Sequence, residues 1–286
     1  MRKYKAVKVL FFFFLLISVV FILLSSTVLV GGVMVKNELE EFKSRGVYIG
    51  TFDVNFLAYK RVEFYEVKKE YNYEFSTRRI YDTSSTSDVT QRFTDKFIGD
   101  IGDIYVASRD PLGTAYTAWA SSKIMIGHCG IVYSNDGRYT YEVVGNQSKE
   151  DNVAKRYYNN WLSAPGPSIT VLRTKQEIDA DSIVEWCDNH TGKPYNYLFP
   201  VKAKNSYYCS DLVSRCIKES NNIEVSTRER LVSGGSMILN DNTYIIYHRE
   251  NSETEGVDYK VYFLSEDWYE QKNNVRWYYC CYRNSC

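Results

Sequence analysis

The stretch "NSYYCSDLVSRCIKES", residues 205–220, decides how the rest of the chain is interpreted. Its apolar side chains recur at the spacing of one face of an α-helix, at Leu212, Val213, Cys216 and Ile217. Ser206 is a plausible N-cap, which places Cys209 in the first turn of the predicted helix. Cys209 is then either a buried core residue, like Cys216, or a nucleophile at the positive end of a helix.

A cysteine becomes a useful nucleophile when a nearby histidine can hold its proton. His128 lies in "KIMIGHCGIVYSNDGRYTYEVVG", residues 123–145, which predicts a β-hairpin that turns at "SNDG". If the loop is the three residues 135–137, Glu142 becomes the diagonal neighbour of His128 on the same face. Cys129 then points to the opposite face. A two-residue loop would instead place Glu142 on the wrong face.

The remaining two histidines have simpler interpretations. His190 ends the predicted helix in "DADSIVEWCDNHTG", residues 179–192, which Asp179 can cap, and we interpret it as structural. His248 ends the predicted strand "NTYIIYH" and is expected to be exposed. Further strands are predicted at 104–107, 169–173 and 259–264. Strands, then helices, then strands again favour an α+β domain with a mostly antiparallel sheet.

The order "IGHCGIVYSNDG", "YEVVG", "GKPYNYLF" and "YYCSDLV", within residues 98–250, resembles the permuted, YiiX-like branch of the NlpC-type papain-like cysteine peptidases. This resemblance implies a circularly permuted papain-like fold in which the nucleophile helix packs on the sheet and follows the histidine strand. It also implies that Cys209 is the nucleophile, His128 the general base and Glu142 the residue that orients the base. Cys129 stands where the family usually has an aliphatic residue.

The expected activity is hydrolysis of an amide bond through a thioester on Cys209. The oxyanion needs hydrogen-bond donors, for which the backbone N–H of Cys209 and the hydroxyl of Tyr195 are candidates. One alternative is acyl transfer to an amine or alcohol by the same Cys–His pair, as in lipid acyltransferases and thioesterases. Another is an inactive binding module that has kept the fold. No cofactor is expected, and no metal, because the seven cysteines include no CxxC pair.

The N-terminus predicts a membrane anchor. The stretch of residues 9–35 carries no charge and is long enough to span a bilayer as a helix. It follows a basic flank of Arg2, Lys3, Lys5 and Lys8. The flank predicts a cytoplasmic N-terminus and an extracytoplasmic catalytic domain. A cleaved signal peptide is the alternative. The expected partners are therefore the membrane and a peptide, cell-wall or lipid amide substrate. A formal net charge of zero without a basic block argues against nucleic acid.

The sequence divides into four predicted parts. Residues 1–36 form the basic flank and single transmembrane anchor, and residues 37–95 a stalk or accessory segment. Residues 96–265 form the papain-like catalytic domain, and residues 266–286 an extension rich in cysteine and aromatic residues. The odd number of cysteines leaves at least one thiol unpaired within a monomer.

Overall fold

The computed structural model describes residues 30–54, 60–67, 97–108, 127–145, 151–163, 168–198, 203–226 and 232–264. Within these ranges, no helix combines the length and the apolar character that crossing a bilayer requires. Most of the predicted anchor, residues 9–35, lies outside the described residues, and so does the predicted extension at 266–286.

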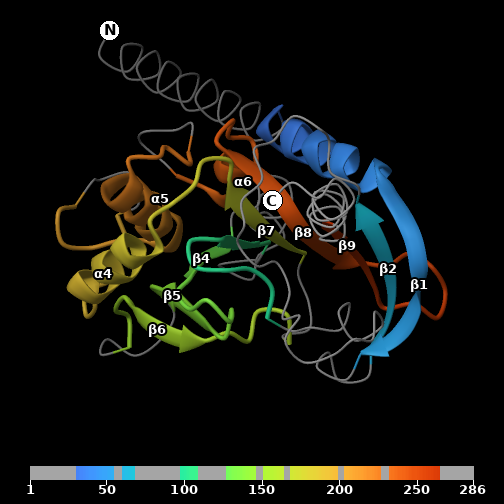
Figure 1. The fold of residues 1–286 in the computed structure, drawn as a ribbon, viewed down its shortest axis with the longest axis horizontal. Coiled ribbons are helices and arrows are strands. Elements are labelled where there is room, and N and C mark those ends of the chain that lie inside the picture. Colours follow the sequence, from blue (N-terminus) through green and yellow to red (C-terminus); the bar gives the residue numbers. More distant parts are fainter. Residues whose placement is uncertain are drawn as a thin grey trace, which may run out of the picture.

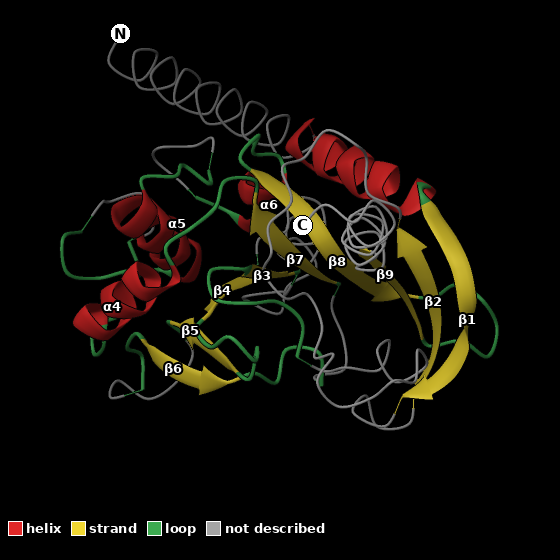
Figure 2. Ribbon diagram, in the orientation of Figure 1, coloured by secondary structure: helices red, strands yellow, loops and turns green. Residues whose placement is uncertain are grey.

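The described residues build one mixed sheet in the order β1-β2-β9-β8-β7-β3-β4-β5-β6 (Figures 1 and 2). The strands are β1 (Gly46–Val54), β2 (Lys60–Val67), β3 (Ile104–Ala107), β4 (His128–Val132), β5 (Tyr139–Glu142), β6 (Lys155–Tyr158), β7 (Ile169–Thr174), β8 (Thr243–Asn251) and β9 (Tyr259–Leu264). Only β2 and β9 pair in parallel among these strands, and every other neighbouring pair is antiparallel. The predicted α+β class with a mostly antiparallel sheet is confirmed.

The labelled helices are α4 (Ala180–His190), α5 (Cys209–Asn221) and the short α6 (Gly234–Ile238), and residues 30–44 form a further helix. Figure 1 shows α4 and α5 side by side at one end of the sheet, and α5 packs against β4 and β5. Asp179 caps α4 by accepting hydrogen bonds from the backbone N–H groups of Asp181 and Ser182, as predicted. The predicted apolar face of α5 is fully buried.

The start of α5 differs from the prediction. Tyr208, not Ser206, is the N-cap, and its side chain makes no capping hydrogen bond. The reason is that the residues before Cys209 are held in extended backbone. The N–H of Tyr207 donates to the carbonyl of Pro194, and the carbonyl of Tyr207 accepts from the N–H of Asn196. The helix therefore begins at Cys209, which still lies in the first turn.

The hairpin that carries His128 has the predicted register. Ile131 pairs with Tyr141 and Val132 with Thr140, as the three-residue loop requires. Gly137 takes the left-handed conformation at φ 69°, which a residue with a side chain rarely adopts. The loop thus sets which residues of β5 share a face with His128.

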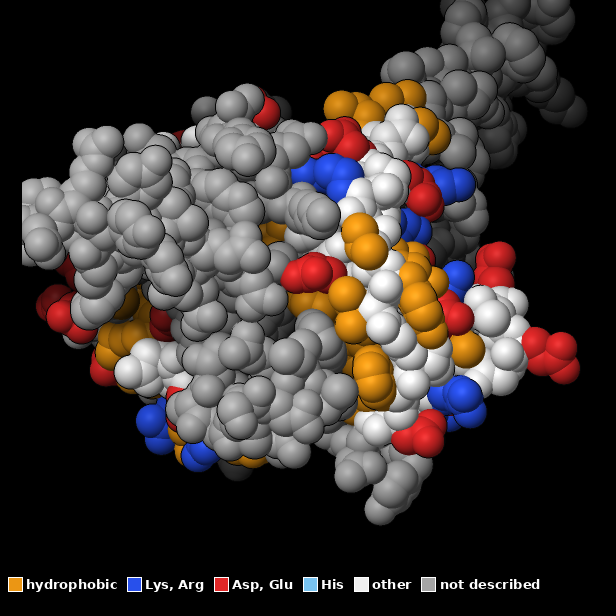
Figure 3. Space-filling view, turned by 45° about the vertical axis from the view of Figure 1, so that its right-hand side comes forward, with side chains coloured by type: hydrophobic (Ala, Val, Ile, Leu, Met, Phe, Trp, Pro, Cys, Tyr) orange, Lys and Arg blue, Asp and Glu red, His pale blue; other side chains and the backbone are white. Residues whose placement is uncertain are grey.

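Part of the segment 37–95 belongs to the same sheet as the predicted catalytic domain. β1 pairs with β2, and β2 pairs in parallel with β9, so these two strands extend the sheet on one side. The helix at 30–44 leads into β1 on the same side of the molecule. β1 is an edge strand, and Val47, Tyr48 and Ile49 are exposed on it. Figure 3 shows apolar side chains gathered on this side of the molecule.

The predicted exposure of His248 is wrong. Its side chain is about 1% exposed, because β8 lies between β7 and β9 and continues to Asn251. The Nδ1 atom of His248 is 2.9 Å from Oγ1 of Thr170, and Nε2 is 3.6 Å from Glu250. Burial is the main reason that the pKa of His248 is lowered, although the carboxylate of Glu250 opposes this.

Candidate active site

The thiol of Cys209 is set beside the histidine strand by the start of α5. Its Sγ atom lies 3.9 Å from the carbonyl oxygen of Gly127, the residue before His128. The imidazole of His128 interacts with the thiol and lowers its pKa, and the backbone N–H groups of Cys129 and Ser210 act in the same direction. The residue at 209 is about 9% exposed, so the sulfur is largely removed from water.

Glu142 binds the other side of the imidazole. Its Oε2 atom is 2.6 Å from Nε2 of His128. Because Nε2 is engaged by the carboxylate, Nδ1 is the ring nitrogen left to face the sulfur. The structure therefore brings Cys209, His128 and Glu142 together in one site, in which Glu142 binds the imidazole and the imidazole interacts with the thiol.

Two further donors hold Glu142 in place, and sequence reasoning missed both. The indole Nε1 of Trp161 donates to Oε1 of Glu142 at 2.7 Å, and the hydroxyl of Thr140 donates to the same oxygen. The Trp161 ring also stacks on His128, with centroids 5.1 Å apart and an interplanar angle of 6°. The turn that carries Trp161 shows no motif, so only spatial contact reveals this residue.

Gly130 completes this packing. A Cβ atom at this position would lie 2.8 Å from Cγ of Glu142 and 3.1 Å from Cζ2 of Trp161. The site thus requires glycine at the third position of "HCG" for steric reasons, because a side chain there would push Glu142 away from the imidazole.

The charges in the site favour a thiolate and an imidazolium. Burial raises the pKa of Cys209, but the hydrogen bond and charge of His128 outweigh it and hold that pKa below its usual value. Burial lowers the pKa of His128, yet the hydrogen bonds to Cys209 and Glu142 raise it to about 10. Burial likewise opposes ionisation of Glu142, but His128, Thr140 and Trp161 together lower its pKa. Such an ion pair is the reactive form of a cysteine nucleophile.

Tyr195 also lies close to the thiol. It forms an isolated parallel bridge with Tyr207, two residues before Cys209. Burial and the nearby charge of Cys209 raise the pKa of its hydroxyl, which therefore stays protonated and able to donate. A Cβ atom on Gly145 would lie 2.8 Å from the Tyr195 ring, so the ring is closely fitted to the end of the hairpin.

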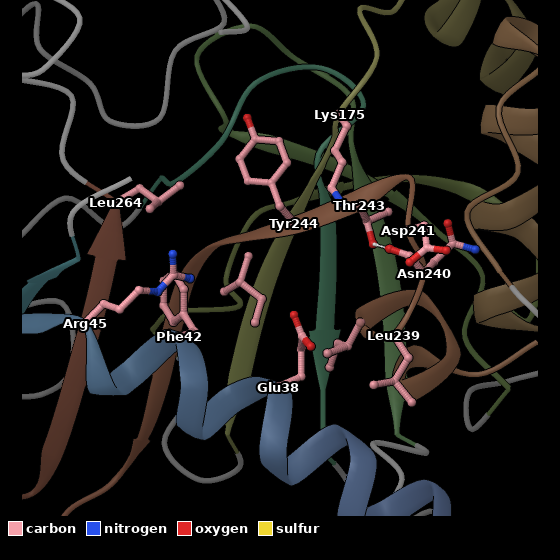
Figure 4. A pocket seen from close by; sticks show the side chains of 12 residues that line it. Glu38, Phe42, Arg45, Lys175, Leu239, Asn240, Asp241, Thr243, Tyr244 and Leu264 are labelled. Atoms are coloured by element: carbon pink, nitrogen blue, oxygen red, sulfur yellow. Dashed lines mark hydrogen bonds between the residues drawn. The ribbon is translucent and has the colours of Figure 1, made fainter. Parts of the chain in front are cut away.

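Two other features of the described residues bear on the protein's chemistry. Within the described ranges, no group of three or more His, Cys, Asp or Glu side chains is arranged to hold a metal ion. Figure 4 shows a cavity of about 110 Å³ between the helix at 30–44 and the start of β8. Glu38 and Phe42 line it from the helix and Arg45 from the turn that follows, and no described lining residue is a cysteine or histidine.

The fold and site are those of a permuted papain-like protein with a cysteine–histidine pair. Residues 99–268 match the family described as permuted papain-like amidase enzyme, YaeF/YiiX, C92 family. This match covers more than half of the chain, and the protein belongs to that family. The relationship predicted from the sequence is thereby confirmed.

Comparison with individual proteins adds little. A search of curated proteins gave no match. Among solved structures, the chain is similar to the crystal structure of metalloprotein YiiX from Escherichia coli O157:H7, with 14% sequence identity and a TM-score of 0.38. The similarity covers 51% of this chain and 96% of that chain.

Proposed function

We propose that this protein is a membrane-anchored cysteine peptidase or amidase that hydrolyses an amide bond through a thioester intermediate. The observation that carries the proposal is the site in which Glu142 binds His128 at 2.6 Å and Cys209 lies at the start of α5, 3.9 Å from the carbonyl oxygen of the residue before His128. Membership of a permuted papain-like amidase family supports the same reaction class. Burial alone does not account for Cys209, because a merely buried thiol would have a raised pKa rather than a lowered one.

The first half of the reaction forms the thioester. The Cys209 thiolate attacks the carbonyl carbon, a carbon–sulfur bond forms, and the carbonyl electrons move to the oxygen. The His128 imidazolium gives its proton to the amine nitrogen as the carbon–nitrogen bond breaks. Glu142 keeps the ring oriented and stabilises its positive charge throughout.

The second half releases the acid. Neutral His128 takes a proton from water, the hydroxide attacks the thioester carbonyl, and the carbon–sulfur bond breaks to regenerate the thiolate and imidazolium. Both halves pass through an oxyanion that needs donors. We assign the backbone N–H of Cys209 and the hydroxyl of Tyr195 to this task, because first-turn N–H groups have no helical carbonyl partner and Tyr195 stays protonated.

The uncharged run at 9–35 and the basic residues before it support an uncleaved single-pass anchor with a cytoplasmic N-terminus. The substrate would then be an extracytoplasmic peptide, cell-wall or lipid amide. A protease added outside intact cells should remove the catalytic domain and spare the N-terminus. A domain protected until the membrane is opened would contradict this orientation.

Trapping of the thioester tests the chemistry. The full-length protein in detergent is mixed with each of a panel of peptide and N-acyl anilide substrates, and the reaction is quenched in acid. The mass of the intact protein is then measured by mass spectrometry. We expect an acyl adduct on Cys209 that decays to free acid. Decay mainly to an amide, when an amine acceptor is present, would indicate acyl transfer. Equal turnover by Cys209→Ala would refute the proposed nucleophile.

A further inference from the structure

The loop after α4 presents two large apolar side chains to solvent. Tyr197 is 57% exposed and Leu198 is 68% exposed, which makes Leu198 the most exposed of the large hydrophobic residues in the described ranges. Scattered single exposures need no explanation, but two consecutive ones beside a reactive thiol are a candidate binding surface.

Backbone contacts place the segment that carries this pair beside the segment that leads to the nucleophile. An isolated parallel bridge joins Tyr195, two residues before Tyr197, to Tyr207, two residues before Cys209. The charge of Cys209 acts directly on Tyr195, whose ring packs on that of Tyr197 with centroids 4.9 Å apart.

The side chain of Tyr197 and the backbone of Leu198 are held in a fixed position. The hydroxyl of Tyr197 donates to the carbonyl of Gly145 at 2.7 Å and accepts from Nδ2 of Asn152 at 2.6 Å. The N–H of Leu198 donates to Oδ1 of Asn196 at 2.9 Å. An exposed apolar surface that is ordered in advance loses little conformational entropy when a ligand covers it.

We infer that Tyr197 and Leu198 form an apolar wall of the substrate site and select amides with a bulky apolar group next to the scissile bond. This inference rests on the proposed function and narrows its substrate class. The occupant is the apolar portion of the substrate, since a substrate attacked by Cys209 must extend over the residues that flank it. The apolar portion leaves water when it packs against this wall, and this burial provides the preference for apolar substrates.

Alkylation of Cys209 tests the wall without needing turnover. Rates are compared for iodoacetamide and its N-octyl derivative, by mass spectrometry of the peptide that contains Cys209. We expect the octyl reagent to react about tenfold faster, which corresponds to burying roughly two methylene groups. Leu198→Ser should remove most of this advantage, measured as the ratio of the two alkylation rates. Val47→Ser, at a 49% exposed position on the far edge strand, is the matched control and should keep the advantage.

The outcomes separate the two proposals. A wild-type protein that reacts with both reagents equally, or a Leu198→Ser variant that keeps the full advantage, would overturn the apolar wall and leave the hydrolase intact. A Cys209 that reacts with neither reagent faster than an ordinary thiol would overturn the proposed function.

A different observation carries a second inference. Cys187 of α4 and Cys216 of α5 are both fully buried, and their Sγ atoms lie 3.7 Å apart. Neither takes part in the proposed reaction. Two facing thiols on neighbouring helices need only small side-chain movements to reach the roughly 2 Å of a disulfide bond.

We propose that Cys187 and Cys216 are joined by a disulfide in the exported protein. Each thiol loses a proton and an electron, and a disulfide-bearing thiol oxidoreductase accepts the two electrons and becomes a dithiol. Because both sulfurs are buried, the bond forms during folding, in a compartment that supports disulfides. Cys216 lies seven residues after Cys209 on α5, so the bond fixes the nucleophile helix to α4 and leaves Cys209 free.

Peptide mapping tests this pair. Full-length protein from membranes of cells that export it is denatured with N-ethylmaleimide, without reductant, and digested with trypsin. We expect the peptide 176–202 to be linked to the tripeptide 216–218, and the peptide 205–215 to carry the maleimide on Cys209. Maleimide on both Cys187 and Cys216 would overturn the proposal.

Thermal unfolding gives a second measure. Reductant should lower the Tm of the wild type by at least about 5 °C, since the bond closes a loop of about thirty residues. The double variant Cys187→Ala, Cys216→Ala should show no response to reductant. A Tm that responds equally in both proteins would contradict the proposed bond.

Discussion

The Oε2 atom of Glu142 lies 2.6 Å from Nε2 of His128, across a hairpin whose three-residue loop makes the two residues diagonal neighbours. A loop one residue shorter would move Glu142 to the opposite face. The carboxylate is thus available to the imidazole only because of the turn at 135–137, and Trp161 and Thr140 then hold it there.

Glu142→Gln keeps this shape and removes the charge. We expect turnover to fall about 10- to 100-fold, less than loss of an acid–base residue itself, which costs about 10²–10⁴-fold. The charge of Glu142 helps to raise the pKa of His128, so its loss should move the alkaline limb of the pH profile to lower pH. A pH–kcat/KM profile measures both effects. An unmoved alkaline limb would argue against the carboxylate as the orienting group.

The pH dependence of Cys209 alkylation tests the ion pair. The thiol pKa is lowered, so the thiolate should form, and the rate should rise, at a pH well below that of an ordinary cysteine. Turnover should then decline as the pH passes about 10, where His128 loses the proton that the leaving amine needs.

Cys209→Ala and His128→Ala should each abolish measurable turnover while the circular dichroism spectrum stays native. In His128→Ala the burial of the thiol is no longer offset, so its pKa should rise above the usual value. We therefore expect alkylation of Cys209 at pH 7 to slow, by about a factor of ten for each unit by which its pKa rises. Full activity in His128→Ala would show that another group is the base.

Two parts of the site, the helix start at Cys209 and the shared face of His128 and Glu142, were predictable because each depends on local rules. The helix period places Cys209 at a helix start, and the turn residues Asn135, Asp136 and Gly137 set the hairpin register. The meeting of Cys209 with His128 came from resemblance to a family rather than from spacing, since no local pattern links positions so far apart.

The features that the sequence did not predict are long-range contacts. The parallel pairing of β2 with β9 joins a segment interpreted as a stalk to the main sheet. β8 lies between β7 and β9 in the same sheet, and this position buries His248. Likewise, the buried Arg173 donates to both carboxylate oxygens of Asp103, at 2.9 and 2.6 Å, from a neighbouring strand. Periodicity reports which face a residue occupies, not which strand will cover it.

Trp161→Phe separates stacking from hydrogen bonding. The phenyl ring retains contact with His128, but the buried carboxylate of Glu142 loses one donor, at a cost of about 1–3 kcal/mol in the free energy of unfolding. We expect lower kcat and a shifted pH profile as well. Trp186→Phe is the matched control, because its indole donates to Glu219, which is exposed and can bind water instead. A Trp161→Phe variant with an unchanged pH profile would assign this residue a purely structural role.

Gly130→Ala tests whether the steric fit around Glu142 matters to the chemistry. The added methyl group would meet Cγ of Glu142 at 2.8 Å, and the carboxylate cannot yield without lengthening its bond to His128. We expect a stability loss of about 1–3 kcal/mol, typical of overpacking, together with a disproportionate fall in kcat/KM. Gly256→Ala, in a turn with open space around the Cβ position and φ 74°, is the control for stability loss alone. Chemical denaturation and substrate kinetics on both variants decide the matter: if Gly130→Ala loses no more activity than Gly256→Ala at equal stability, the close fit of Glu142 is not needed for catalysis.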